Sequence, residues 1–176
     1  MENLLKEIDQ HIDRVQDFPQ EGIQYKDISP IFLNPGLCDR IIKVFAESNR
    51  GKIDAVCGIE SRGFLLGVQI ARELGVPFIL IRKAGKLPPP VISQEYDLEY
   101  GSAKIEVKEG HIKPGQRILI HDDVLATGGT ATACAELAER CGAKVEQFSF
   151  LIGLSFLNGT EGLKKYTSNV QILLEY

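Results

Sequence analysis

The stretch that most limits the fold of this chain runs from residue 118 to residue 133 and reads ILIHDDVLATGGTATA. Its apolar start is typical of a buried parallel strand, and Asp122 and Asp123 follow at the carboxyl end, where open α/β sheets bind ligands. Gly128 and Gly129 allow a tight turn, and the Ala-rich segment after them is expected to form a helix whose first N–H groups can hold an anion. This order of elements predicts an α/β fold with a ligand site at one edge of its sheet.

The same segment also indicates which chemical class of ligand the site can bind. Thr127 and Thr130 add hydroxyl donors to the expected anion cradle. Asp122 and Asp123 would repel a bare phosphate, but carboxylates accept hydrogen bonds from both hydroxyls of a ribose diol. The segment therefore favours a sugar phosphate over the alternative, a plain strand–turn–helix with solvated acids.

Hydrophobic patterning elsewhere predicts strands and helices that alternate within one domain spanning residues 1–176. Helical spacing indicates a helix that includes apolar residues from Leu4 to Val15, a second after Pro35 and a third from Phe64 to Leu74. Apolar runs predict strands, and a partly alternating stretch predicts a hairpin; the strands cover 53–59, 76–81, 145–154 and 170–176, and the hairpin lies within 93–110. The strand–helix–strand order between 53 and 81 implies a parallel sheet.

Charge and cysteine usage exclude several classes of function. The net charge is −4 and the pI about 5.5, so we expect no nucleic-acid partner and no membrane surface. Apolar runs fall short of the roughly 20 residues of a membrane helix, and the acidic amphipathic N-terminus does not resemble a signal peptide. The cysteines form no C-x-x-C pair and are expected to be reduced thiols, which favours the cytoplasm; they are Cys38, Cys57, Cys134 and Cys141.

Basic residues follow the predicted strands at the same edge. Arg62, Arg82, Lys83 and Lys86 would share the rim of the sheet with the anion cradle. One monophosphate does not need that many cations, whereas a departing pyrophosphate does. The alternative for each is an ordinary solvated surface charge.

Three further residues are interpreted from their place in the sequence, and two of them have two possible roles. Glu99 could exchange a proton with a substrate nitrogen if the hairpin that carries it and Tyr100 closed over the site, or it could be exposed on that hairpin. Tyr25 could stack on a flat ligand, although packing is the favoured interpretation. Strand alternation points His121 away from the ligand and into the packing between sheet and helix.

With these residues in view, the chain resembles the type I phosphoribosyltransferases. DDVLATGGT is their general signature, and FPQEGIQYKDISP, GIESRGFLLG, LIRKAGKLP and YDLEYG resemble the branch that acts on adenine. The resemblance implies a five-stranded parallel core flanked by helices, a small N-terminal hood and a flexible loop. It also implies a homodimer that uses Mg²⁺, held mainly by substrate, to convert adenine and phosphoribosyl pyrophosphate (PRPP) to AMP and pyrophosphate in purine salvage.

The resemblance further implies a role for each matching residue. Glu99 would be the acid/base residue, and the Glu60–Ser61 peptide would be cis. The binding residues would be Ala126, Thr127, Gly128, Gly129 and Thr130 for phosphate, Asp122 and Asp123 for ribose, Ser61, Arg62, Arg82, Lys83, Lys86 and Tyr100 for pyrophosphate, and Gln24, Tyr25, Lys26, Val124 and Leu125 for the base.

Alternatives to adenine transfer remain open. The hood has Gln24, Tyr25 and Lys26 where the family commonly has a small apolar residue, Phe and Arg, so another purine base is the nearest alternative. A regulator that senses PRPP is a second, although the acidic chain shows no basic face for DNA. A nucleotide-binding subunit without turnover is a third.

Overall fold

The computed structural model describes residues 1–97 and 101–176. Glu99 and Tyr100, assigned above to catalysis and to pyrophosphate, lie outside the described residues. The chain forms two compact units, residues 1–44 and residues 45–176, and each is treated by itself.

The first unit combines a helix with a small hairpin. Its elements are α1 (Glu2–Gln10), β1 (Asp13–Gln16), β2 (Gln24–Asp27), the 3-10 helix η1 (Ser29–Leu33) and the start of α2 (Pro35–Glu47). The helix expected to reach Val15 ends at Gln10, so that prediction was wrong at its end. Val15 instead pairs with Tyr25 across the antiparallel β1–β2 hairpin, because strand pairing at 13–16 overrides an apolar spacing that also fits a helix.

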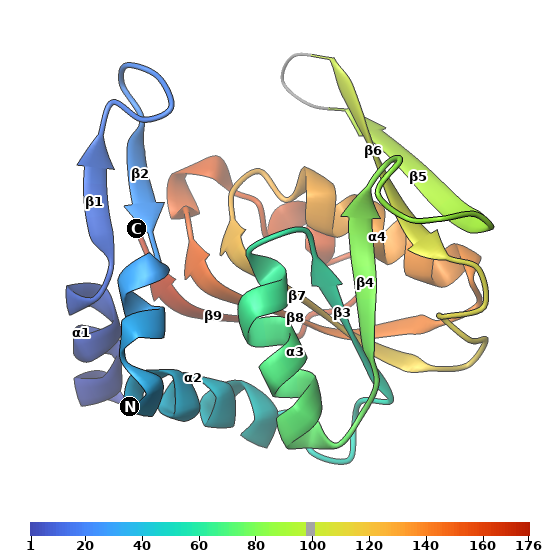
Figure 1. Cartoon of the computed structure of the whole chain (residues 1–176), viewed down its shortest axis with the longest axis horizontal. Helices are drawn as coiled ribbons and strands as arrows, with labels where there is room; N and C mark the ends of the chain where they lie inside the picture. Colours follow the sequence, from blue (N-terminus) through green and yellow to red (C-terminus); the bar gives the residue numbers. More distant parts are fainter. Residues whose placement is uncertain (98–100) are drawn as a thin grey trace. The chain divides into compact units, whose positions relative to one another are not determined.

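A mixed sheet organises the second unit (Figure 1). In its described part, seven strands lie in the order β5-β6-β4-β3-β7-β8-β9. From β4 to β9 all neighbours pair in parallel, which confirms the expected parallel core, whereas β6 is antiparallel to both β4 and β5. The strands are β3 (Ala55–Ile59), β4 (Phe78–Lys83), β5 (Val91–Asp97), β6 (Ser102–Lys108), β7 (Arg117–Leu125), β8 (Lys144–Gly153) and β9 (Val170–Glu175).

Helices cover both faces of this sheet. Figure 1 shows α3 (Gly63–Leu74) in front of the sheet and α4 (Gly129–Arg140) behind it. The buried side of α4 is rich in alanine and packs on apolar side chains of the sheet, including Ile120 and Phe148. On the other side, Phe64 of α3 meets Phe78 of β4 edge to face, with ring centroids 5.9 Å apart. Burial on both faces explains why the central strands read as continuous apolar runs.

Other expectations can be compared directly with the structure. The hairpin predicted within 93–110 is β5 and β6, and all four cysteines are free thiols. Among the described residues, no helix has both the length and the apolar character needed to cross a membrane. After β8, two 3-10 helices, η2 (Ser155–Leu157) and η3 (Glu161–Leu163), lead to β9.

Candidate functional site

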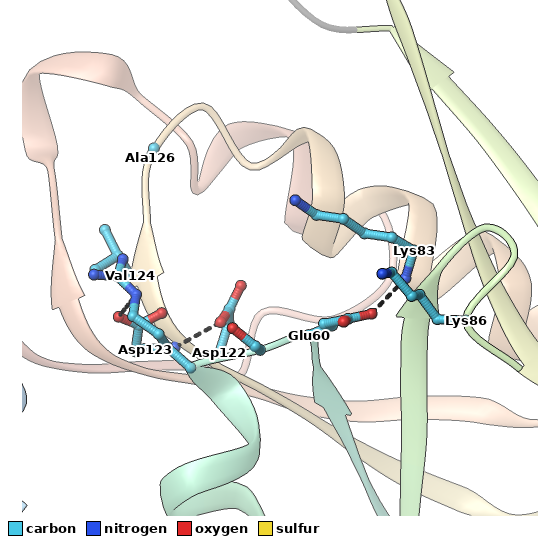
Figure 2. A pocket seen from close by; sticks show the side chains of 9 residues that line it. Glu60, Lys83, Lys86, Asp122, Asp123, Val124 and Ala126 are labelled. Atoms are coloured by element: carbon cyan, nitrogen blue, oxygen red, sulfur yellow. Dashed lines mark hydrogen bonds and ion pairs between the residues drawn. The ribbon is translucent and has the colours of Figure 1, made fainter. Parts of the chain in front are cut away.

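The carboxyl ends of β3, β4 and β7 open onto a cavity of about 570 Å³ (Figure 2). Figure 2 shows the lysine side chains on one side and the two aspartates opposite them, with Ala126 on the loop after β7. The structure thus brings together most of the residues expected at the sheet edge. The lining residues are Glu60, Ser61, Arg62, Lys83, Lys86, Asp122, Asp123, Val124 and Ala126.

A second hollow, of about 490 Å³, adjoins the first. Glu60, Lys83 and Asp122 line both spaces. The β5–β6 hairpin supplies Tyr96 and Lys104, and α4 supplies Thr130. An extended ligand could therefore reach from the cationic rim to the start of α4.

The two aspartates of the cavity, Asp122 and Asp123, both have raised carboxyl pKa values. The side chain of Asp123 is 5% exposed, and Arg62 Nε lies 2.9 Å from its Oδ2, as an ion pair without hydrogen-bond alignment. Asp122 Oδ1 accepts the Asp123 N–H at 2.8 Å. Burial, reinforced by the neighbouring Asp123, raises the pKa of Asp122 well above its usual range. Burial also raises the pKa of Asp123, and Arg62 opposes that shift. A ligand that brings hydroxyl donors or positive charge would relieve this pair.

The Arg82 side chain forms hydrogen bonds with Glu60 and does not line the cavity. Its Nη2 lies 2.9 Å from Glu60 Oε1, its Nε donates to Oε2 at 3.2 Å, and its Nη1 donates to the Lys86 carbonyl at 3.1 Å. Glu60 also accepts the Lys83 N–H, at 2.9 Å. The hydrogen bonds from Arg82 lower the pKa of the Glu60 carboxyl. Arg82 therefore anchors the end of β4, which carries Lys83, and the turn after it, which carries Lys86.

Glu60 itself was missing from the residues expected in the site, although it lines both hollows. One signal could have identified it: Glu60 and Arg82 directly follow Ile59 and Ile81, which pair in the β3–β4 register. Opposite charges at the same level of neighbouring parallel strands predict an ion pair. The peptide that joins Glu60 to Ser61 is cis, as the resemblance implies.

Lys83 at the end of β4 and Lys86 on the turn after it supply positive charge to the cavity. Lys83 and Lys86 are exposed, and within residues 1–97 and 101–176 no carboxylate forms an ion pair with either ammonium group. Their charge is therefore available to an anionic ligand.

The turn after β7 has the features expected of an anion cradle. We call residues 126–130 the phosphate loop. Gly128 has a φ of +82°, which favours glycine, and it is the N-cap of α4 without any side-chain capping bond. The first N–H groups of α4 and the positive end of its dipole remain available to an anion. Thr127 is exposed, and Thr130 Oγ1 donates to Tyr96 Oη at 3.2 Å.

Residues expected to hold the base are divided between the two units. Val124 lines the cavity, whereas Leu125 is 3% exposed and packs in the core. Within residues 1–44, Lys26 Nζ donates to Gln24 Oε1 at 2.7 Å, and the Tyr25 ring meets Phe18 edge to face at 5.1 Å. This contact agrees with the favoured packing interpretation of Tyr25.

His121 points away from the cavity, as strand alternation predicts. It is fully buried, its Nδ1 lies 2.8 Å from Ser149 Oγ, and its ring meets Phe45 edge to face at 5.3 Å. Burial lowers its pKa to about 3, so the ring is neutral near pH 7. It contributes packing rather than charge to the strand that carries the aspartates.

Comparison with known proteins agrees with this geometry. An adenine phosphoribosyltransferase of Christiangramia forsetii is 46% identical over 171 residues, which cover 97% of this chain and 99% of that protein. The adenine phosphoribosyltransferase structure from Thermoanaerobacter pseudethanolicus has a TM-score of 0.93 at 40% identity, with 98% of this chain and 99% of that chain covered. The enzyme of Saccharomyces cerevisiae, solved with an imino-altritol bisphosphate and adenine, has a TM-score of 0.92 at 39% identity, with 99% and 100% covered. The family model described as a phosphoribosyl transferase domain matches residues 28–171, so the chain belongs to the phosphoribosyltransferase family.

Proposed function

We propose that this protein transfers the 5-phosphoribosyl group of PRPP to N9 of adenine, releasing AMP and pyrophosphate in purine salvage. The observation that carries the proposal is one cavity in which paired carboxylates and basic side chains meet, and in which Ala126 begins the loop that leads into the glycine-rich start of α4. The similarity to proteins named adenine phosphoribosyltransferase, over nearly the whole chain, supports adenine as the base.

The charges in the cavity suit a displacement in which bond breaking leads. PRPP would place its 5′-phosphate on the phosphate loop and its diol against Asp122 and Asp123. The bond between C1′ and the pyrophosphate oxygen breaks with its electron pair going to pyrophosphate, where Arg62, Lys83 and Lys86 stabilise the growing negative charge. The ribosyl ring becomes cationic and is stabilised by the aspartates until N9 bonds to C1′.

Glu99 is proposed as the acid/base residue that exchanges a proton with the adenine ring, and Tyr100 as a pyrophosphate contact. Both lie outside the described residues, so their roles rest on the resemblance and on their chemistry. Their described neighbour Tyr96 lines the second hollow together with Thr130. Exclusion of water from this space would protect PRPP from hydrolysis.

The donor set fits a magnesium ion that is bound mainly by substrate. Among the described residues, no group of three or more His, Cys, Asp or Glu side chains could hold a metal by itself. Asp122 and Asp123 offer the oxygen ligands that Mg²⁺ prefers, and they would hold it together with substrate oxygens and water. Bound there, the ion would neutralise charge on the pyrophosphate.

The proposal also covers the residues that bind the base, the oligomeric state and the cellular compartment. Val124 would contact the purine, and the resemblance also assigns Leu125, Gln24, Tyr25 and Lys26 to base binding. The alternation of strands and helices supports a single phosphoribosyltransferase domain over residues 1–176, and the family resemblance implies a homodimer. The free cysteines support a cytoplasmic setting.

The decisive experiment is incubation with adenine, PRPP and Mg²⁺, with AMP and pyrophosphate measured separately. We expect both products in equal amounts with adenine, and far less nucleotide with hypoxanthine, guanine or xanthine. Preference for another base would refute the choice of adenine. PRPP binding without pyrophosphate release would favour the sensor or the non-catalytic subunit.

A further inference from the structure

The phosphate loop is in direct backbone contact with a second glycine segment. This segment is the β8–β9 linker, residues 154–169, which runs from the end of β8 through η2 and η3 to β9. Its start is tied to β7, because the Leu154 N–H donates to the Leu125 carbonyl at 2.9 Å. Asn158 then adopts a left-handed φ of 52°, and the buried Gly159 follows. The linker thereby comes back against the loop that β7 leads into.

The contact leaves no room for a side chain from either partner. A Cβ atom on Gly159 would lie 3.1 Å from both the Ala126 carbonyl carbon and the Gly128 nitrogen, and would overlap the Ala126 oxygen. In the opposite direction, a Cβ on Gly128 would lie 3.2 Å from the Gly159 carbonyl carbon and would overlap its oxygen. All of these neighbours are backbone atoms, which cannot rotate away as a side chain would.

We infer that Gly159 is a positioning residue for 5′-phosphate binding, because its missing side chain lets the linker brace the phosphate loop from behind. This inference rests on the proposed function. An anion held by successive N–H groups needs those groups within about 0.5 Å of their productive positions. A backbone in van der Waals contact with Ala126 and Gly128 limits such movement. The role differs from that of Gly128, whose left-handed φ forms the turn itself.

Gly159→Ala tests this contact without adding backbone strain. Gly159 does not have a positive φ, so alanine can adopt its conformation, and the added methyl group acts only through the contact with the phosphate loop. Gly162→Ala is the matched control in the same linker. There the added Cβ would meet only the rotatable Thr132 hydroxyl, at 3.3 Å.

We expect Gly159→Ala to raise the KM for PRPP and the Kd for AMP by about 10- to 100-fold, while kcat at saturating PRPP changes much less. This split is expected because the 5′-phosphate does not take part in the bond changes. Gly162→Ala should leave all three constants near those of the unmodified protein. A folded Gly159→Ala variant that loses kcat while keeping its KM for PRPP would overturn the inference. If the variant instead loses its fold, with kcat and the melting temperature lowered together, amide hydrogen exchange in the unmodified protein decides.

A measurement on the unmodified protein keeps the inference testable even if Gly159→Ala does not fold. Saturating AMP should slow amide hydrogen exchange in residues 155–163 as well as in the phosphate loop. Protection confined to the phosphate loop would overturn the bracing role. If the unmodified protein binds no AMP, the proposed function fails and this inference fails with it. Normal AMP binding by Gly159→Ala would overturn the inference alone.

Discussion

Replacing Asp122 with asparagine should make the protein more stable and less active at the same time. The change removes one negative charge from the cavity but keeps a side-chain oxygen that can accept the Asp123 N–H. This substitution therefore tests separately what the charge of Asp122 contributes to stability and what it contributes to activity. If the aspartate pair is there to bind the ligand, its negative charge should lower the free energy of unfolding when the site is empty.

The gain in stability has a definite sign and pH dependence. Burial raises the pKa of folded Asp122 well above 3.8, and Arg62 pairs with Asp123 rather than with Asp122. Between the ordinary and the raised pKa, the folded state binds more protons than the unfolded chain, so the free energy of unfolding decreases as pH rises. Asparagine removes this effect, and we expect a gain of about 1 kcal/mol at pH 8. For a chain of this size that corresponds to about 2–4 °C in Tm, and the gain should shrink as pH falls toward 4.

The loss of activity follows from the ligand contacts that the charge would make. A hydrogen bond to a charged group contributes about 1.5–3 kcal/mol, so one weakened diol contact should lower kcat/KM for PRPP by about 10- to 150-fold. Part of this loss should appear in kcat, because the carboxylate also stabilises a ribosyl ring that is cationic only near the transition state.

Thermal unfolding from pH 5 to pH 8 and steady-state kinetics with varied PRPP measure both effects. Asp39→Asn, an exposed aspartate on α2, is the matched control and should change neither quantity. A lower Tm for Asp122→Asn at pH 8 would show that the charge stabilises the fold. An unchanged kcat/KM would remove Asp122 from the ribose site.

Three further substitutions test the remaining charges. Glu99→Gln should lower kcat by about 100-fold, with exposed Glu95→Gln as its control, and an unchanged kcat would exclude acid/base catalysis. Arg62→Gln should raise the KM for PRPP and move the acidic limb of the pH–rate profile upward, because Asp123 loses the cation that lowers its pKa; an unmoved limb would contradict this. Arg82→Lys should also raise that KM, since lysine cannot hold both Glu60 oxygens as a planar guanidinium does, whereas wild-type kinetics would exclude the anchoring role.

The predictable part of the fold and site rests on local patterns. The apolar run before Asp122 forms β7, and Gly128 takes the left-handed conformation at the start of α4. Strand alternation alone placed His121 in the packing on the opposite side. Each of these outcomes depends on neighbouring residues in the chain, so a single sequence contains the information.

Pairings between distant segments were less accessible. An arginine at the end of a strand can bind a ligand or form an ion pair with a neighbouring strand. The β3–β4 register pairs Ile59 with Ile81, so Arg82 lies beside Glu60 and forms an ion pair with it. Val15 left the expected helix for a similar reason, since its partner Tyr25 lies across a hairpin. In both cases a contact outside the local sequence decides between two conformations that the local pattern permits.

Gly159 illustrates a different limit. Sequence reasoning finds functional residues through the groups that their side chains present, and Asp122 and Arg62 present such groups. A position whose contribution is the absence of a side chain gives no chemical signal, and many glycines serve only in turns. Only the distance from Gly159 to the backbone of Ala126 and Gly128 separates this glycine from those. The chemistry of a phosphate site can therefore be read from one segment, whereas the position of its backbone N–H groups also depends on how closely another segment packs against it.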